Sequence, residues 1–104
     1  MSLNVLLVCG SGASSGFMAA NMRKAAKKRA LDYKIQARSE AELESYVNEI
    51  DVLMIGPHLA YMEQEVKALV DPAKVTVILM QPDYYSILDG NQALDHLQKV
   101  LESN

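Results

Sequence analysis

Tryptophan is absent from the sequence, and Phe17 is its only phenylalanine beside five tyrosines. So few aromatic side chains offer no platform on which nucleic-acid bases could stack. The net charge of −3 also lacks the basic excess that is typical of general nucleic-acid binding. No apolar run approaches the roughly 20 residues that cross a bilayer. We therefore expect a globular protein with no nucleic-acid partner and no membrane-spanning segment.

Cysteine is equally scarce, since Cys9 is the only one in 104 residues. A single thiol allows no internal disulfide, and the N-terminus enters an apolar run at once, without the basic lead or the cleavage site of a secretion signal. The length suits one domain, which we place over residues 1–104. Any chemistry at this thiol must therefore be something other than pairing within the chain.

Apolar segments with the length of strands alternate with segments of helical spacing along the whole chain. The predicted strands are residues 3–8, 32–37, 51–56 and 75–80. The predicted helices are residues 15–30, 39–50 and 59–70, and a final helix is lined by residues 94–101. Between the last strand and the last helix, residues 81–83 are expected to open a tyrosine-containing loop and residues 89–91 to form a turn. This alternation predicts an α/β fold, in which a four-stranded parallel sheet of order 2-1-3-4 has helices on both faces.

That strand order places the first strand inside the sheet, with Cys9 at its carboxyl end. Connections leave this point in opposite directions, and open α/β sheets bind their ligands there. The next residues are mainly glycine and serine and lead into a helix. Unpaired N–H groups and the helix dipole make such a segment an anion site and lower the pKa of a neighbouring thiol. We predict that Cys9 is a nucleophile in a three-layer fold with a phosphatase-like phosphate loop. The predicted loop residues are Gly10, Ser11, Gly12, Ala13, Ser14, Ser15 and Gly16.

Several familiar phosphate-binding patterns do not fit this loop. The nucleotide P-loop needs a lysine after its second glycine, but Phe17 follows Gly16. Gly10 and Gly12 begin a dinucleotide fingerprint whose third glycine is missing. A receiver-type phosphoacceptor domain calls for an aspartate at the end of the third strand, where Gly56 stands. Ordinary nucleotide binding and phosphoaspartate chemistry are therefore disfavoured.

The pattern favours a protein that accepts a phosphoryl group and keeps it until an acceptor arrives, and two alternatives to such a phosphoryl carrier stay open. A low-molecular-weight cysteine phosphatase has the spacing C-x-x-x-x-x-R, and here Ser15 stands where the arginine belongs, although Asp83 could serve as an acid. Without the guanidinium, the transition state lacks its bidentate partner. A non-enzymatic anion-binding or redox-sensing module is the second alternative. A lone cysteine after a buried strand is also often just a small apolar residue, but so many glycines and serines after it favour a backbone that meets a ligand.

Three stretches, "VLLVCGSGASSGFMAANMRKAA", "DVLMIGPHLAYM" and "YYSILDG", resemble the enzyme IIB component of the phosphotransferase system (PTS), lactose/cellobiose (chitobiose) class. The similarity extends over essentially the whole chain. It implies that Cys9 accepts a phosphoryl group from a phosphohistidine of the IIA protein and passes it to a sugar held by the membrane component IIC. The sugar would be a β-linked disaccharide such as cellobiose, chitobiose or lactose. The resemblance implies no metal, nucleotide or other cofactor, and a cytoplasmic protein that meets the membrane through IIC.

Four residues outside the loop are candidates for the rim of the site. Pro57 and His58 follow the third strand, and Asp83 and Tyr84 follow the fourth, so all four belong to the sheet edge that carries Cys9. His58 could hydrogen-bond the phosphoryl group or could simply be an exposed loop histidine, since the resembling family often has an amide-bearing residue there. The short chain favours a monomer.

Other side chains have more ordinary expected roles. We expect Tyr61 and Met62 to pack a helix against the sheet, one of the adjacent tyrosines Tyr84 and Tyr85 to lie in the core, and His96 to lie on the surface of the last helix. Five basic residues share the first helix, and a solvated face is favoured over docking to an acidic IIA surface. They are Arg23, Lys24, Lys27, Lys28 and Arg29.

Overall fold

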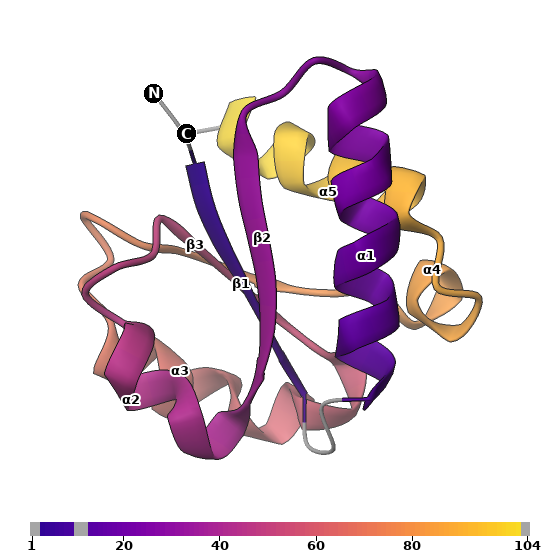
Figure 1. Ribbon diagram of the computed structural model, residues 1–104. Coiled ribbons are helices and arrows are strands. Elements are labelled where there is room, and N and C mark those ends of the chain that lie inside the picture. The colour runs from indigo at the N-terminus through magenta and orange to yellow at the C-terminus, as the bar shows by residue number, and fades with distance from the viewer. Residues whose placement is uncertain (1–2, 10–12, 103–104) are drawn as a thin grey trace.

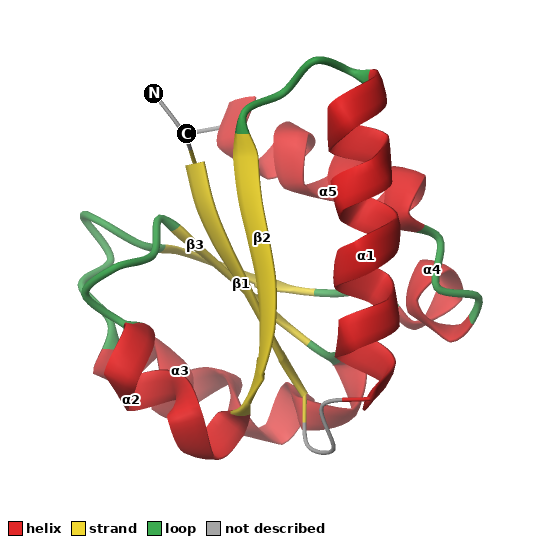
Figure 2. Ribbon diagram, viewed as in Figure 1, coloured by secondary structure: helices red, strands yellow, loops and turns green. Residues whose placement is uncertain are grey.

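The computed structural model describes residues 3–9 and 13–102 of the chain. Within these ranges, four strands form one parallel sheet in the order β2-β1-β3-β4, which confirms the predicted topology (Figure 2). The strands are β1 (Leu3–Cys9), β2 (Tyr33–Ser39), β3 (Val52–Ile55) and β4 (Thr76–Leu79). The helices are α1 (Ala13–Lys28), α2 (Leu43–Tyr46), α3 (Glu63–Leu69), α4 (Pro82–Ser86) and α5 (Gly90–Glu102), with the 3-10 helices η1 (Glu40–Glu42) and η2 (Pro57–Met62).

Helices cover both faces of the sheet, with α1 and α5 on one side and α2 and α3 on the other (Figure 1). Along β1, Val5 and Leu7 point into the core shared with α1 and α5, whereas Leu6 and Val8 belong to the core on the opposite face. All four are at most 2% exposed. A strand that is buried on both faces needs apolar residues at every position, which explains its continuous apolar run. Each such side chain contributes about 1.5–3 kcal/mol through burial.

The second predicted helix is much shorter than expected. Glu42 accepts hydrogen bonds from the backbone N–H and the hydroxyl of Ser39, both at 3.3 Å, as in half of a capping box. The backbone then forms η1 and only one turn of α2. The N–H of Glu49 bonds to the carbonyl of Tyr46 at 2.9 Å, three residues back, so a tight turn replaces the continued α-helix up to Ile50.

Two segments that were expected to be irregular are helical. The tyrosine-containing loop is α4, which begins at Pro82, where the fixed φ of proline suits the first helical position. The expected turn at residues 89–91 is the start of α5, because Asp89 accepts hydrogen bonds from the backbone N–H of Gln92 at 3.1 Å and from its side-chain amide at 2.9 Å. The reading of Asp89 as a turn residue was wrong because the same side chain also caps helices.

The turn geometry of η2 corrects another expectation. Tyr61 does not pack against the sheet, because its side chain is 76% exposed. The backbone of η2 kinks at Leu59, and this side chain and that of Met62 pack on the core while Tyr61 turns outward. The expectation for Met62 is confirmed. In the part of the chain that the structure describes, no helix combines the length and the apolar character needed to cross a membrane.

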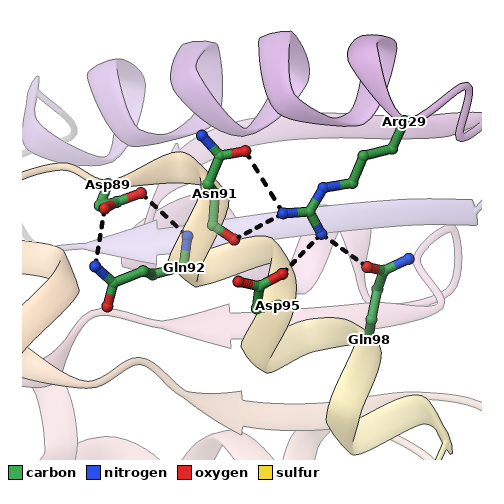
Figure 3. A network of polar contacts seen from close by, with 6 residues as sticks. All are labelled: Arg29, Asp89, Asn91, Gln92, Asp95 and Gln98. Atoms are coloured by element: carbon green, nitrogen blue, oxygen red, sulfur yellow. Dashed lines mark hydrogen bonds and ion pairs between the residues drawn. The ribbon is translucent and has the colours of Figure 1, made fainter.

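Two of the basic residues of the first helical segment hold the fold together. Arg29, just after α1, forms an ion pair with Asp95 at 2.9 Å and donates to Gln98 at 2.9 Å, with longer contacts to Asn91 (Figure 3). Arg23 donates to the carbonyl of Ile35 at 2.8 Å. The three lysines of the same segment and Arg23 are exposed, so the expectation of a solvated face applies to them, and only Arg29 is partly buried.

Candidate functional site

Cys9 is the last residue of β1, and its neighbours β2 and β3 fix the position of its backbone. In the strand register, Cys9 lies opposite Ser39 of β2, and on the other side the N–H of Gly56 donates to the carbonyl of Val8 at 3.0 Å. The carboxyl ends of β1 and β3 therefore lie side by side. Because the connection from β1 leads to β2 and the chain then returns to β3, this is the point at which the strand order reverses.

The predicted phosphate loop is shorter than expected at its helical end. The predictions for Gly10, Ser11 and Gly12 lie outside the described residues. The backbone of Ala13, Ser14 and Ser15 forms, with Gly16, the first turn of α1, so the helix begins two residues earlier than its apolar spacing indicated. This first turn contains no acidic residue. The N-terminus of a helix of 16 residues thus starts a few residues after Cys9, with N–H groups and a dipole that favour an anion.

The segment after β3 brings Pro57 and His58 beside the end of β1. Pro57 opens η2, and the imidazole of His58 folds back over Gly56, where an added Cβ would lie 2.7 Å from its Cε1 atom. Any larger residue at Gly56 would displace this ring. The His58 ring also contacts the ring of Tyr85 at a centroid distance of 5.8 Å, which joins the segments that follow β3 and β4.

Sequence reasoning did not pair His58 with Tyr85. The two residues belong to different loops, and no periodicity or motif relates them. Tyr85 is buried, and so is Tyr84, so both adjacent tyrosines lie in the core where one was expected. The only feature that could have indicated this contact was the predicted sheet order, which puts the segments after β3 and β4 next to each other.

The two remaining rim candidates lie on α4. Asp83 is exposed in the first turn of α4, and its carboxylate accepts the N–H of Tyr84 at 2.8 Å. The ring of Tyr84 is buried, and its hydroxyl lies 2.6 Å from Nδ1 of His96 on α5. These two side chains line a cavity of about 490 Å³ together with residues of α5. The polar end of Tyr84 is thus directed at α5, and His96 is half-buried instead of lying fully on the surface.

The contact between Tyr84 and His96 predicts a dependence of stability on pH. Burial raises the pKa of Tyr84 to about 12, so its hydroxyl keeps its proton, and it shares a hydrogen bond with the neutral imidazole of His96. Burial, helped by the nearby charge of Lys99, lowers the pKa of His96 below its ordinary value. The unfolded chain therefore takes up this proton more readily, and the free energy of unfolding should decrease as the pH falls below about 6.5.

Urea unfolding at about pH 7.5 and pH 5.5 would measure this effect. The carboxylates also titrate toward acid, so the comparison is with His96→Gln, which removes the imidazole of His96 alone. The variant should lose less stability than the wild type between the two pH values. Equal losses in the two proteins would contradict the prediction.

The comparisons with known proteins agree with this architecture. The family described as "PTS system, Lactose/Cellobiose specific IIB subunit" matches residues 4–96. The galactose-specific EIIB component of Lactococcus lactis subsp. cremoris is 30% identical over 102 residues, covering 93% of this chain and 94% of that protein. The cellobiose-specific EIIB component of Lactococcus lactis subsp. lactis has the same identity and coverage. The lactose-specific EIICB component of Lacticaseibacillus casei is 25% identical and covers 95% of this chain, which corresponds to 18% of that longer protein.

Solved structures show the same fold. The cellobiose-specific phosphotransferase IIB component from Borrelia burgdorferi superposes with a TM-score of 0.73 at 25% identity, covering 91% of this chain and 87% of that one. The lactose-specific IIB domain from Streptococcus pneumoniae gives a TM-score of 0.83 at 18% identity, covering 98% and 97%, and supports the fold alone. The chain therefore belongs to the lactose/cellobiose-specific IIB subunits of the PTS, which are phosphotransferase components of sugar transport.

Proposed function

We propose that Cys9 carries the phosphoryl group in this IIB component, between a phosphohistidine of IIA and a sugar bound by IIC. In the first step the thiolate attacks phosphorus, the S–P bond forms, and the P–N bond breaks with its electron pair returning to the histidine of IIA. In the second step a sugar hydroxyl attacks the phosphocysteine and loses its proton to water. The S–P bond then breaks, which releases the thiolate and a sugar phosphate ester.

The observation that carries the proposal is the position of the only cysteine. Cys9 ends the interior strand of the sheet, and the N-terminus of α1, with no acid in its first turn, follows within a few residues. A helix N-terminus favours a thiolate over a thiol and also favours a bound phosphoryl group. One feature thus supports both the nucleophile and the phosphorylated state.

The transferring group needs positioning and charge stabilisation more than covalent help. In the proposal, backbone N–H groups of residues 10–16 hold the phosphoryl oxygens, and the serine hydroxyls in that segment add hydrogen bonds. No arginine stands in the segment, which favours a carrier over a hydrolase. The sugar in the proposal is a β-linked disaccharide such as cellobiose, chitobiose or lactose. The names of the family and of two relatives, which contain cellobiose or lactose, support it, whereas another relative is galactose-specific. The chain would act as a cytoplasmic monomer that meets the membrane through IIC.

The test mixes the protein with a phosphorylated IIA of the lactose/cellobiose class and follows the intact mass. One phosphoryl group should arrive, peptide mapping should place it on Cys9, and it should persist until IIC and a sugar are added. Steady release of inorganic phosphate without IIC would instead support the cysteine-phosphatase alternative. Oxidation of Cys9 without any gain of a phosphoryl group would support a redox-sensing module.

A further inference from the structure

Three large apolar side chains that follow strands at the carboxyl edge of the sheet are exposed: Phe17 after β1, Tyr61 after β3 and Ile87 after β4. Phe17 is 67% exposed and lies one turn inside α1, and Ile87 is 66% exposed directly after α4. Single exposed apolar residues are common on protein surfaces, but a pair on one face beside a reactive centre indicates a contact surface.

Phe17 and Ile87 belong to one continuous surface. Asn21 follows Phe17 by four positions on the same face of α1, and its side-chain amide donates to the carbonyl of Leu88 at 2.8 Å. An added Cβ at Gly90 would lie 2.4 Å from the carbonyl carbon of Asn21, so the backbone at residues 88–90 rests directly on α1. Figure 1 shows this crossing, with the chain between α4 and α5 beside α1. Ile87 directly precedes Leu88, so the end of α4 lies beside the turn of α1 that contains Asn21, one turn along the helix from Phe17.

The same face of α1 becomes basic farther from Cys9. Lys24 and Lys28 continue the helical spacing of Phe17 and Asn21, and both are exposed. They line a shallow cavity of about 270 Å³ between α1 and residues 88–91. Asp89 also lines it, but its carboxylate accepts two hydrogen bonds from Gln92, which holds it at the start of α5. Although the chain as a whole carries a net charge of −3, the two lysines outnumber Asp89 among the charged residues that line this cavity.

We propose that Phe17, Ile87, Lys24 and Lys28 form the docking surface for the phosphoryl donor IIA, an inference that rests on the proposed function. The donor must bring its phosphohistidine to Cys9, so its body must cover neighbouring elements at this sheet edge. A phosphorylated donor is anionic, whereas the sugar acceptor is neutral, so a basic flank attracts the donor in particular. After transfer the donor has lost that charge, which weakens the attraction and favours release. The fitting partner face is apolar at its centre and acidic on one side.

The first experiment measures kcat/KM for phosphorylation by phosphorylated IIA in the double variant Phe17→Ser/Ile87→Ser. Loss of two apolar contacts should lower kcat/KM at least about tenfold, mainly through KM, while kcat at saturating donor is retained. Lys24→Gln/Lys28→Gln should lower kcat/KM at low salt and make it less sensitive to added salt than in the wild type. Because all four side chains are exposed, thermal unfolding should confirm that the variants are folded.

Leu69→Ser is the matched control. Leu69 is 47% exposed at the end of α3 and lines a different cavity, with residues 47–51, 70–71 and 74–75, so this variant should behave like the wild type. If Phe17→Ser/Ile87→Ser matches Leu69→Ser, the docking surface is wrong. If only the transfer to sugar in the presence of IIC is slowed, the surface serves the acceptor and the assignment to IIA is wrong.

A binding measurement separates this inference from the proposed function. In the Cys9→Ser background, phosphorylated IIA should still bind, and Phe17→Ser/Ile87→Ser should weaken that binding by a similar factor. If the wild type gains no phosphoryl group but IIA binds through this surface, the role of Cys9 fails and the docking surface stands. If IIA binds with equal affinity to the variant and the control, the docking surface fails whatever happens at Cys9.

Discussion

Cys9→Ser should lower the rate of phosphoryl transfer from phosphorylated IIA by at least about a thousandfold, since it removes the nucleophile. A thiol near a helix N-terminus is readily ionised, but a serine hydroxyl is too weak an acid to become an alkoxide in the same field. The two side chains differ by one atom, so the backbone of β1 should be undisturbed. Quenched-flow sampling with intact-mass detection would measure the rate in both proteins.

Ser39→Ala provides the control for this change. Ser39 ends β2 directly opposite Cys9 in the strand register, and its hydroxyl bonds only to the exposed Glu42 among the described residues. Removing it perturbs the same sheet edge without touching the nucleophile, so transfer should continue at close to the wild-type rate. If Cys9→Ser still gained a phosphoryl group at the wild-type rate, the nucleophile would have to be sought elsewhere.

The sheet was predictable because its strands are buried on both faces. Residues such as Leu6 and Leu7 follow one another along β1 yet lie in opposite cores, and only a two-sided sheet makes that arrangement favourable. Strand order then followed from the right-handed crossovers between parallel strands. Cys9 was predictable as part of this edge for the same reason, since its position depends on the adjacent strand and helix and not on distant contacts.

The short helices were not predictable in the same way. In α2 and α4 the local pattern is compatible with a longer helix, a loop or a turn, and tertiary contacts decide among them. Tyr84 is an example, because its burial depends on a hydroxyl contact with His96, twelve residues away. The contact of His58 with Tyr85 likewise arises only when β3 and β4 are neighbours. The rim of the site is therefore determined by long-range packing, which no local sequence motif predicts.

The contact between α1 and α5 gives the second large effect. Gly90→Ala should lower the free energy of unfolding by about 3 kcal/mol, because the new methyl group would lie 2.4–2.6 Å from backbone atoms of Asn21 and Met22. Backbone atoms cannot move aside as a flexible side chain can, so α5 must shift as a whole. That shift would strain the network in which Arg29 joins Asp95 and Gln98. Urea unfolding of the two proteins would measure the loss.

Gly16→Ala is the same chemical change with the opposite expected sign. Gly16 lies in the first turns of α1, and an added Cβ there would meet no atom within 4 Å in the described part of the chain, apart from its own neighbours and the nearby helix backbone. Alanine restricts the unfolded chain and favours the helix, so stability should rise by up to about 1 kcal/mol. If both variants gained stability, α5 would have to tolerate a wider separation from α1 at no cost. A loss confined to Gly90→Ala would instead trace the effect to the close approach of the two helices, because the gain in helix propensity is common to both changes.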